Sequence, residues 1–255
     1  MKRRLPMKRS IFISTLVIAI VLFSIPCFAY AETNPPTVID GTDYSLIDKS
    51  SNENMNDGFS GGRDARPEDI KDSLFQSVIP NHSYKYSIPK TRTCFTYYAQ
   101  EKKYSCGPAC VRMALYYLTD TVYNESVIRI GCGTTFSGTY LRDMKNYINS
   151  EQTIHSYNTC FGASLSSMQS DLYNGLNYGG ALPIIGVQES TANLWPFTLT
   201  SHILAVYYIT SDYSTFCVAD PWAGYSNPNS SYKCYSVSSS MLYDAYSAKN
   251  IGYMY

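Results

Sequence analysis

The chain has 255 residues, of which 45% are hydrophobic and 16% charged, a composition typical of a globular domain and not of a disordered protein. Its 20 basic and 20 acidic residues balance, but five of the basic residues and none of the acidic ones fall in the first 31 positions. Without that segment 15 basic and 20 acidic residues remain, and this net negative charge argues against nucleic acid as a partner.

The first 31 residues have the features of a secretory signal peptide. Basic residues between Lys2 and Arg9 precede an apolar run from Ile11 to Phe28, and Ala29-Tyr30-Ala31 supplies the small residues that a signal peptidase requires. The run is almost long enough for an uncleaved membrane anchor, but Pro26 and the Ala-x-Ala site favour cleavage near Ala31. We therefore expect a secreted or cell-surface protein with no stable membrane insertion after cleavage.

Residues 32–90 are expected to be a linker or pro-segment. The stretch up to about residue 70 is polar, rich in Asn, Asp, Ser and Gly, and without periodicity. Within it, Gly58-Phe59-Ser60-Gly61-Gly62 matches the pattern of a serine nucleophile elbow, but the polar residues on both sides lack the strand and helix that an elbow needs. As a pro-segment, this stretch would cover a cleft of the domain that follows.

Residues 91–255 are predicted to form one domain that begins with helices. The first helix carries an apolar stripe at helical spacing, Ser105 can cap it, and Pro108 falls in its first turn, where a missing N–H costs nothing. Thr139 can cap the second helix. The predicted helices cover residues 106–118, 139–148 and 166–176.

The second half of this domain has short apolar runs rich in β-branched and aromatic residues and bounded by turn residues. The predicted strands cover residues 182–187, 202–209, 215–219, 232–237 and 251–255, with a short helix over 241–246. Helices followed by an antiparallel sheet predict an α+β fold.

Eight cysteines are present, and Cys27 would leave with the signal peptide. Seven is an odd number, so an oxidising compartment allows up to three disulfides and leaves one free thiol. Cys217 and Cys234 lie on strands predicted to pair, which makes them the best candidates for one disulfide.

Cys106 has the surroundings expected of a reactive thiol, because it begins a predicted helix and a helix N-terminus favours the thiolate. Of the three histidines, His82 and His155 lie in polar segments and are expected at the surface, whereas His202 opens an apolar strand. Asp220 ends the next strand, and antiparallel neighbours place the start of one beside the end of the next. We therefore expect the His202 and Asp220 side chains to be close.

Gln100 lies six residues before Cys106, and its amide is a candidate oxyanion donor together with the backbone N–H of Cys106. Cys110 competes for the role of nucleophile, but it lies further along the helix, where the N-terminal field has faded. No Cys or His group has zinc spacing and no glycine-rich phosphate loop follows a strand, so we expect no metal and no other cofactor.

Gln100, then Cys106-Gly107-Pro108-Ala109, then His202, then Asp220-Pro221 is an order that resembles the C39-like branch of the papain-fold cysteine peptidases, over roughly residues 95–225. The resemblance implies a papain-like α+β fold, with the helix that bears the nucleophile packed on an antiparallel sheet. It implies a cysteine peptidase that hydrolyses peptide bonds in a peptide or protein substrate. In it Cys106 is the nucleophile, His202 the general base, Asp220 the orienting residue and Gln100 the oxyanion donor.

The sequence also departs from this family. Ser201 stands where many members have Gly, and the membrane exporter of the bacteriocin-processing members is missing from this sequence, so their substrate does not carry over. Because those members cut after two glycines, Gly61-Gly62 is a candidate self-processing site, although only Phe59 fits the apolar positions expected upstream. Two alternatives stay open: a transpeptidase or amidase with the same triad, and a secreted binding protein that has lost catalysis.

Overall fold

The computed structural model describes residues 61–70, 95–189 and 195–255, and the core of this part is a six-stranded sheet in which every neighbouring pair of strands is antiparallel. In spatial order the strands are β3 (Thr159–Cys160), β8 (Tyr253–Met254), β4 (Ile184–Val187), β5 (His202–Ile209), β6 (Thr215–Ala219) and β7 (Cys234–Ser238). All of β4 and most of β5 are buried, which explains why their sequences are continuously apolar instead of alternating.

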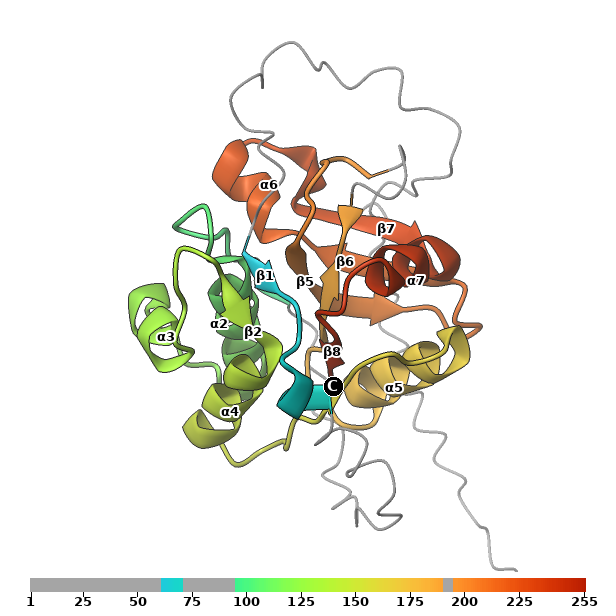
Figure 1. Ribbon diagram of the computed structural model, residues 1–255, viewed down its shortest axis with the longest axis horizontal. Helices are drawn as coiled ribbons and strands as arrows, with labels where there is room; N and C mark the ends of the chain where they lie inside the picture. The colour runs from blue at the N-terminus through green and yellow to red at the C-terminus, as the bar shows by residue number, and fades with distance from the viewer. Residues whose placement is uncertain (1–60, 71–94, 190–194) are drawn as a thin grey trace, which may run out of the picture. The chain divides into compact units, whose positions relative to one another are not determined.

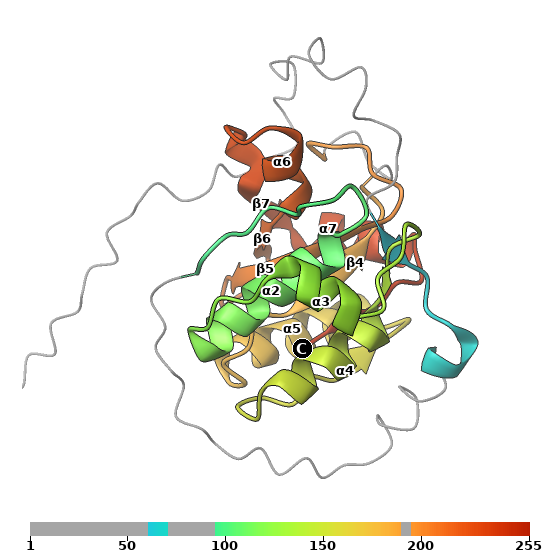
Figure 2. The ribbon, with the colours of Figure 1, turned by 90° about the vertical axis from the view of Figure 1, so that its left-hand side faces the viewer.

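Helices cover both faces of this sheet. Figure 1 shows α2 (Cys106–Thr119), α3 (Glu125–Gly131) and α4 (Leu141–Glu151) on one side, and α5 (Leu165–Asn177) and α7 (Ser239–Ser247) on the other. In the turned view of Figure 2 the first three helices lie in front of the sheet. Helix α2 packs directly on β5. The arrangement confirms the predicted α+β class.

Several element bounds match the sequence prediction, and the differences have local causes. Strands β5 and β6 and the start of α2 lie where they were predicted. Ser105 does not cap α2 with its side chain, which contacts Glu125 instead. Thr139 is not a cap either: it lies in β2 (Thr139–Tyr140), and Tyr140 precedes α4.

Among the described residues, the sequence did not predict several short elements, including β1 (Gly62–Arg63), β2, β3, α3 and α6 (Pro221–Ser226). The Asp220-Pro221 pair that ends β6 therefore starts a helix: Pro221 occupies its first turn, and Asp220 caps it by accepting a hydrogen bond from Trp222 N at 2.9 Å. A single 3₁₀ turn, η3 (Ser231–Lys233), leads into β7.

The predicted disulfide between Cys217 and Cys234 is wrong. Strands β6 and β7 do pair, but their register sets Cys217 opposite Ser236 and Cys234 opposite Ala219. Both thiols are free, as is every other cysteine in the described ranges. Cys217 Sγ lies 3.3 Å from Ser236 Oγ instead.

The predicted signal peptide and most of the predicted linker lie outside the described residues. Within the ranges that the structure covers, no helix combines the length and the apolar character needed to cross a bilayer.

Gly186 in β4 packs too closely on the segment before β8 to accept a side chain. A Cβ there would lie 2.1 Å from Cγ2 of Ile251, while Gly186 N donates to the carbonyl oxygen of Gly252 at 2.8 Å. We expect Gly186→Ala to lower the free energy of unfolding by about 1–3 kcal/mol, because the strand cannot move without breaking that bond. Urea denaturation measures the loss.

The Ile251→Gly background provides the control for this substitution, because it removes both the Cγ2 atom at 2.1 Å and the Cβ atom at 2.3 Å. If the clash with Ile251 is the cause, Gly186→Ala will cost less in that background than in the wild-type protein. Equal costs in both backgrounds would contradict the explanation.

Candidate active site

Cys106 is the first residue of α2 and is fully buried at the junction of the helix layer and the sheet. Gly107 follows it in close contact with α4, because a Cβ there would lie 2.6 Å from Sδ of Met144 and would require the end of that side chain to shift. The N-terminus of α2 therefore packs closely against α4. Its unsatisfied N–H groups and its macrodipole favour a negative charge at the position of the thiol.

His202 and Asp220 are joined by a hydrogen bond. His202 is the first residue of β5, Asp220 directly follows β6, and these two strands are antiparallel neighbours. His202 Nε2 lies 2.8 Å from Asp220 Oδ1, and both side chains are fully buried. The proximity predicted from the strand order is confirmed.

The charge of Asp220 decides the protonation of this pair. Burial by itself would lower the pKa of His202, but the charge of Asp220 and its hydrogen bond to the imidazole outweigh burial and hold the pKa well above its usual value. The thiol of Cys106 also contributes to the raised pKa. Because Nε2 is engaged by Asp220, the buried Nδ1 is the atom left for the thiol.

A family model described as the Peptidase_C39 like family matches residues 93–249, a range that contains all three of these residues. The chain belongs to the Peptidase_C39 like family. Among solved structures, the peptidase domain of Streptococcus ComA, a bi-functional ABC transporter involved in a quorum sensing pathway, is similar at 17% sequence identity and a TM-score of 0.44. That match covers 64% of this chain and 97% of the ComA domain. No curated protein matches the chain.

In this Peptidase_C39 like domain, the amide of Gln100 is hydrogen-bonded to the turn that precedes Cys106. Gln100 is almost fully buried, and its Nε2 donates to the carbonyl oxygens of Lys102 at 2.8 Å and Lys103 at 3.0 Å. Its backbone N donates to Pro221 O at 3.1 Å, which links the turn to α6. Gln100 thus lies beside the site, but its amide is engaged with backbone, and the oxyanion role stays a prediction.

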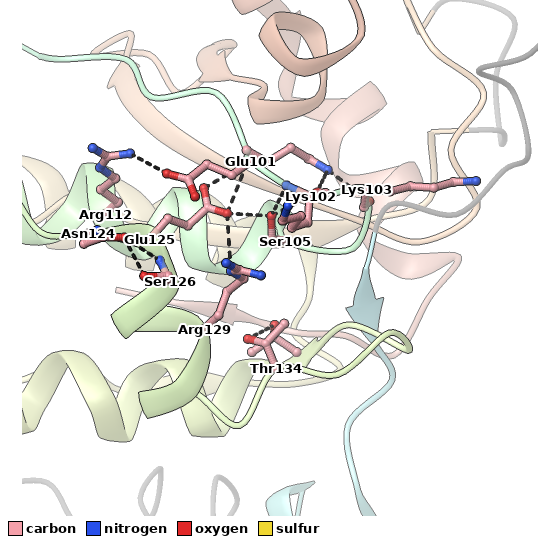
Figure 3. Close-up of polar contacts among 12 residues, drawn as sticks. Glu101, Lys102, Lys103, Ser105, Arg112, Asn124, Glu125, Ser126, Arg129 and Thr134 are labelled. Atoms are coloured by element: carbon pink, nitrogen blue, oxygen red, sulfur yellow. Dashed lines mark hydrogen bonds and ion pairs between the residues drawn. The ribbon is translucent and has the colours of Figure 1, made fainter.

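A buried carboxyl group, not found from the sequence, anchors the same turn (Figure 3). Glu125 is the first residue of α3; both of its carboxylate oxygens accept from Glu101 N at 3.1 Å, and Oε1 lies 2.7 Å from Oγ of Ser105. Ser105 Oγ in turn accepts from Lys102 N at 2.9 Å. The turn that precedes Cys106 is therefore held by several hydrogen bonds to Glu125 at the start of α3.

The remaining residues singled out from the sequence have mixed outcomes. Cys110 lies inside the core, donates to Ile203 O at 3.4 Å, and has a pKa raised well above the usual value, first by burial, which suits a structural thiol. His155 is not a surface residue: it is half-buried against the ring of Tyr157, and burial lowers its pKa. His82 lies outside the described residues.

Behind Asp220 lies a second buried acid that the sequence did not reveal. Glu189 follows β4 and is fully buried, and the hydroxyl of Tyr235 on β7 lies 3.3 Å both from Glu189 Oε1 and from Asp220 Oδ2. Burial, followed by the charge of Asp220, raises the pKa of Glu189 well above its usual value. As a neutral acid Glu189 can donate to Tyr235, which then donates to Asp220, and each hydroxyl proton has an acceptor.

Glu189, His202 and Asp220 also place three ligand-type atoms within 4.8 Å of one another, a spacing that a metal ion could use. The direct bond from His202 to Asp220 occupies the Nε2 atom of the imidazole. We therefore interpret the group as a hydrogen-bond chain that ends on His202.

Replacing Asp220 by Asn keeps the shape of the side chain and removes its charge. Without that charge burial dominates, so we expect the pKa of His202 to fall and the imidazolium to be lost at lower pH than in the wild-type protein. NMR titration of the His202 ring, assigned with a His202→Ala variant, measures the shift. An unchanged midpoint would show that Asp220 does not set the protonation of His202.

Tyr235→Phe removes the hydroxyl that Glu189 and Asp220 share. Because a hydrogen bond to a charged group contributes about 1.5–3 kcal/mol, we expect alkylation of Cys106 at neutral pH to slow by roughly tenfold or more. The rate constant for iodoacetamide labelling measures the effect. Tyr208→Phe is the control, since Tyr208 is 54% exposed. An equal effect of both variants would rule out the chain through Tyr235.

Proposed function

We propose that the chain is a secreted cysteine peptidase that hydrolyses peptide bonds through Cys106, His202 and Asp220. The observation that carries the proposal is the 2.8 Å bond between His202 Nε2 and Asp220 Oδ1, which is fully buried and leaves Nδ1 for the thiol of Cys106. Membership of the Peptidase_C39 like family supports a peptide or protein substrate.

The proposed reaction is acyl transfer through a thioester. His202 takes the proton of the Cys106 thiol, and the thiolate attacks the carbonyl carbon of the scissile peptide bond. His202 then gives that proton to the leaving amine, the C–N bond breaks, and the acyl group stays on Cys106. A water molecule, deprotonated by His202, attacks the thioester and releases the acid and the thiol. Throughout the cycle Asp220 orients the imidazole and stabilises its charged form.

The carbonyl oxygen carries a negative charge in each tetrahedral intermediate and needs donors. We assign this role to the backbone N–H of Cys106 and the side-chain amide of Gln100. Gln100 donates to the carbonyls of Lys102 and Lys103 in the present structure, so one of those bonds has to be exchanged for the substrate oxygen.

We further propose that the first 31 residues are removed and that the protein acts outside the cell. The support is the N-terminal sequence pattern alone, because the cysteines of the described ranges are free thiols and do not themselves require an oxidising compartment.

Cys106→Ala is expected to abolish cleavage of a peptide mixture, whereas Cys110→Ala, which removes the neighbouring buried thiol, is expected to retain it. Mass spectrometry of the digested mixture detects the new termini. Added amine acceptors separate hydrolysis from transpeptidation, since an acyl group captured by the amine changes the product mass.

Cleavage that persists in Cys106→Ala would overturn the assignment of the nucleophile. A wild-type protein that cleaves nothing, and whose Cys106 is alkylated only above about pH 8.5 as an ordinary thiol is, would favour the inactive binding protein instead.

A further inference from the structure

Residues 61–70 precede the catalytic domain in sequence and yet pack into it. Strand β1 pairs in parallel with β2, and Figure 1 shows the two side by side. Thr139 N donates to the carbonyl oxygen of Gly61 at 2.8 Å, and further along Ala65 N donates to Asn250 O at 2.5 Å. Residues 61–66 thus run without helical structure between β2 and the residues before β8, and residues 67–70 form a helical turn.

The two glycines of this segment touch the backbone on both sides of the candidate active site. A Cβ at Gly61 would lie 2.2 Å from the carbonyl oxygen of Tyr104, two residues before the nucleophile. A Cβ at Gly62 would lie 3.2 Å from the carbonyl oxygen of His202, and Gly62 O accepts a hydrogen bond from Ser201 Oγ. Gly61 also has φ +100°, a conformation that side chains disfavour. Only glycine therefore fits at position 61.

An ionic cluster fastens the segment to α4. Arg66 contacts Asp69 and Asp143 at 2.9 Å each, and Arg142 contacts Asp69 at 2.9 Å. Asp69 is only 2% exposed; burial opposes its ionisation, but the hydrogen bonds from Arg66 and Arg142 prevail and lower its pKa. The guanidinium groups of Arg63 and Arg66 also lie over the ring of Tyr140, at 3.8 and 4.4 Å from its centroid.

We propose that residues 61–70 are an autoinhibitory strap that binds in cis and denies substrates access to Cys106. The inference rests on the proposed function, since it assumes that a peptide substrate reaches the thiol along the positions that this segment occupies. The strap already uses Thr139 N and the hydroxyl of Ser201, and its two glycines fill the space beside Tyr104 and His202. An extended peptide cannot occupy these positions until the strap leaves, so release of the strap would activate the enzyme.

The test uses the secreted full-length protein with two variants confined to the strap. Arg66→Ala removes the ionic anchor, and Gly61→Val adds a side chain where a carbonyl oxygen leaves no room. Glu68→Ala is the matched control, because Glu68 lies in the same segment with a 62% exposed side chain and only a 3.6 Å contact to Arg66. Hydrogen exchange of residues 61–70 reports release of the strap, and iodoacetamide labelling of Cys106 reports access to the site.

We expect both variants to exchange faster in the strap and to label Cys106 at least about tenfold faster, because the accessible population rises with release. Glu68→Ala should match the wild-type protein. Faster exchange with unchanged labelling would overturn the proposal, as would unchanged exchange in both variants. A secreted chain whose intact mass places its start after Gly62 would also overturn it, since the segment would then be a substrate for self-processing.

The failure of the proposed function is a different result. If the Arg66→Ala and Gly61→Val variants label rapidly at Cys106 but cleave no peptide, the strap proposal is supported and the peptidase assignment is wrong.

Discussion

The contact between His202 and Asp220 sets the conditions that the rest of the site has to meet. Removing an imidazole and a carboxylate from water is costly unless each remaining polar atom finds a partner. Asp220 meets this demand with three hydrogen bonds to its carboxylate, from His202, from Trp222 N and from Tyr235. Its backbone carbonyl accepts a fourth, from the hydroxyl of Tyr97 at 2.8 Å. The carboxylate is therefore held in one orientation before any substrate arrives.

The sheet sets the distance between His202 and Asp220, and the helix layer carries the thiol of Cys106. The antiparallel pairing of β5 with β6 brings residues 202 and 220 together although a hairpin separates them in the chain. Helix α2 packs on β5, so the helix N-terminus that carries Cys106 meets the strand that begins with His202. The proposed nucleophile and the proposed base thus belong to two layers, and the packing of those layers determines their geometry.

The sequence was sufficient for features that depend on local pattern. A periodicity or a turn signal marks the helix from Cys106, the strand from His202 and the strand that ends before Asp220. The antiparallel order of the two strands then predicts that His202 and Asp220 lie close together. Glu189 and Tyr235 lack such a signal: Glu189 is a polar residue after an apolar run, Tyr235 is one of many tyrosines in the chain, and only the assembled sheet brings them to Asp220.

Strand register and the hydrogen-bond partners of single side chains could not be predicted from the sequence, for a related reason. The pairing of β6 with β7 could be expected, but the two-residue offset that separates Cys217 from Cys234 is decided by the packing of both faces of the sheet. Likewise, the spacing between Gln100 and Cys106 suggests an oxyanion donor, whereas the short turn between them offers backbone carbonyls that the amide takes first. The two-residue ladder of β1 with β2 is too short to leave a pattern at all.

The position of β5 inside the sheet affects how the protein unfolds. β5 is hydrogen-bonded on both edges and buried along most of its length, so its amides belong to the unit that opens only in global unfolding. The segment at residues 61–70 is joined by a two-residue ladder and an ionic cluster at the surface of α4, and such peripheral contacts open at a much lower free energy. The segment at residues 61–70 can therefore open locally while the His202 imidazole and the Asp220 carboxylate stay paired, and heat should separate that pair only when the whole domain unfolds.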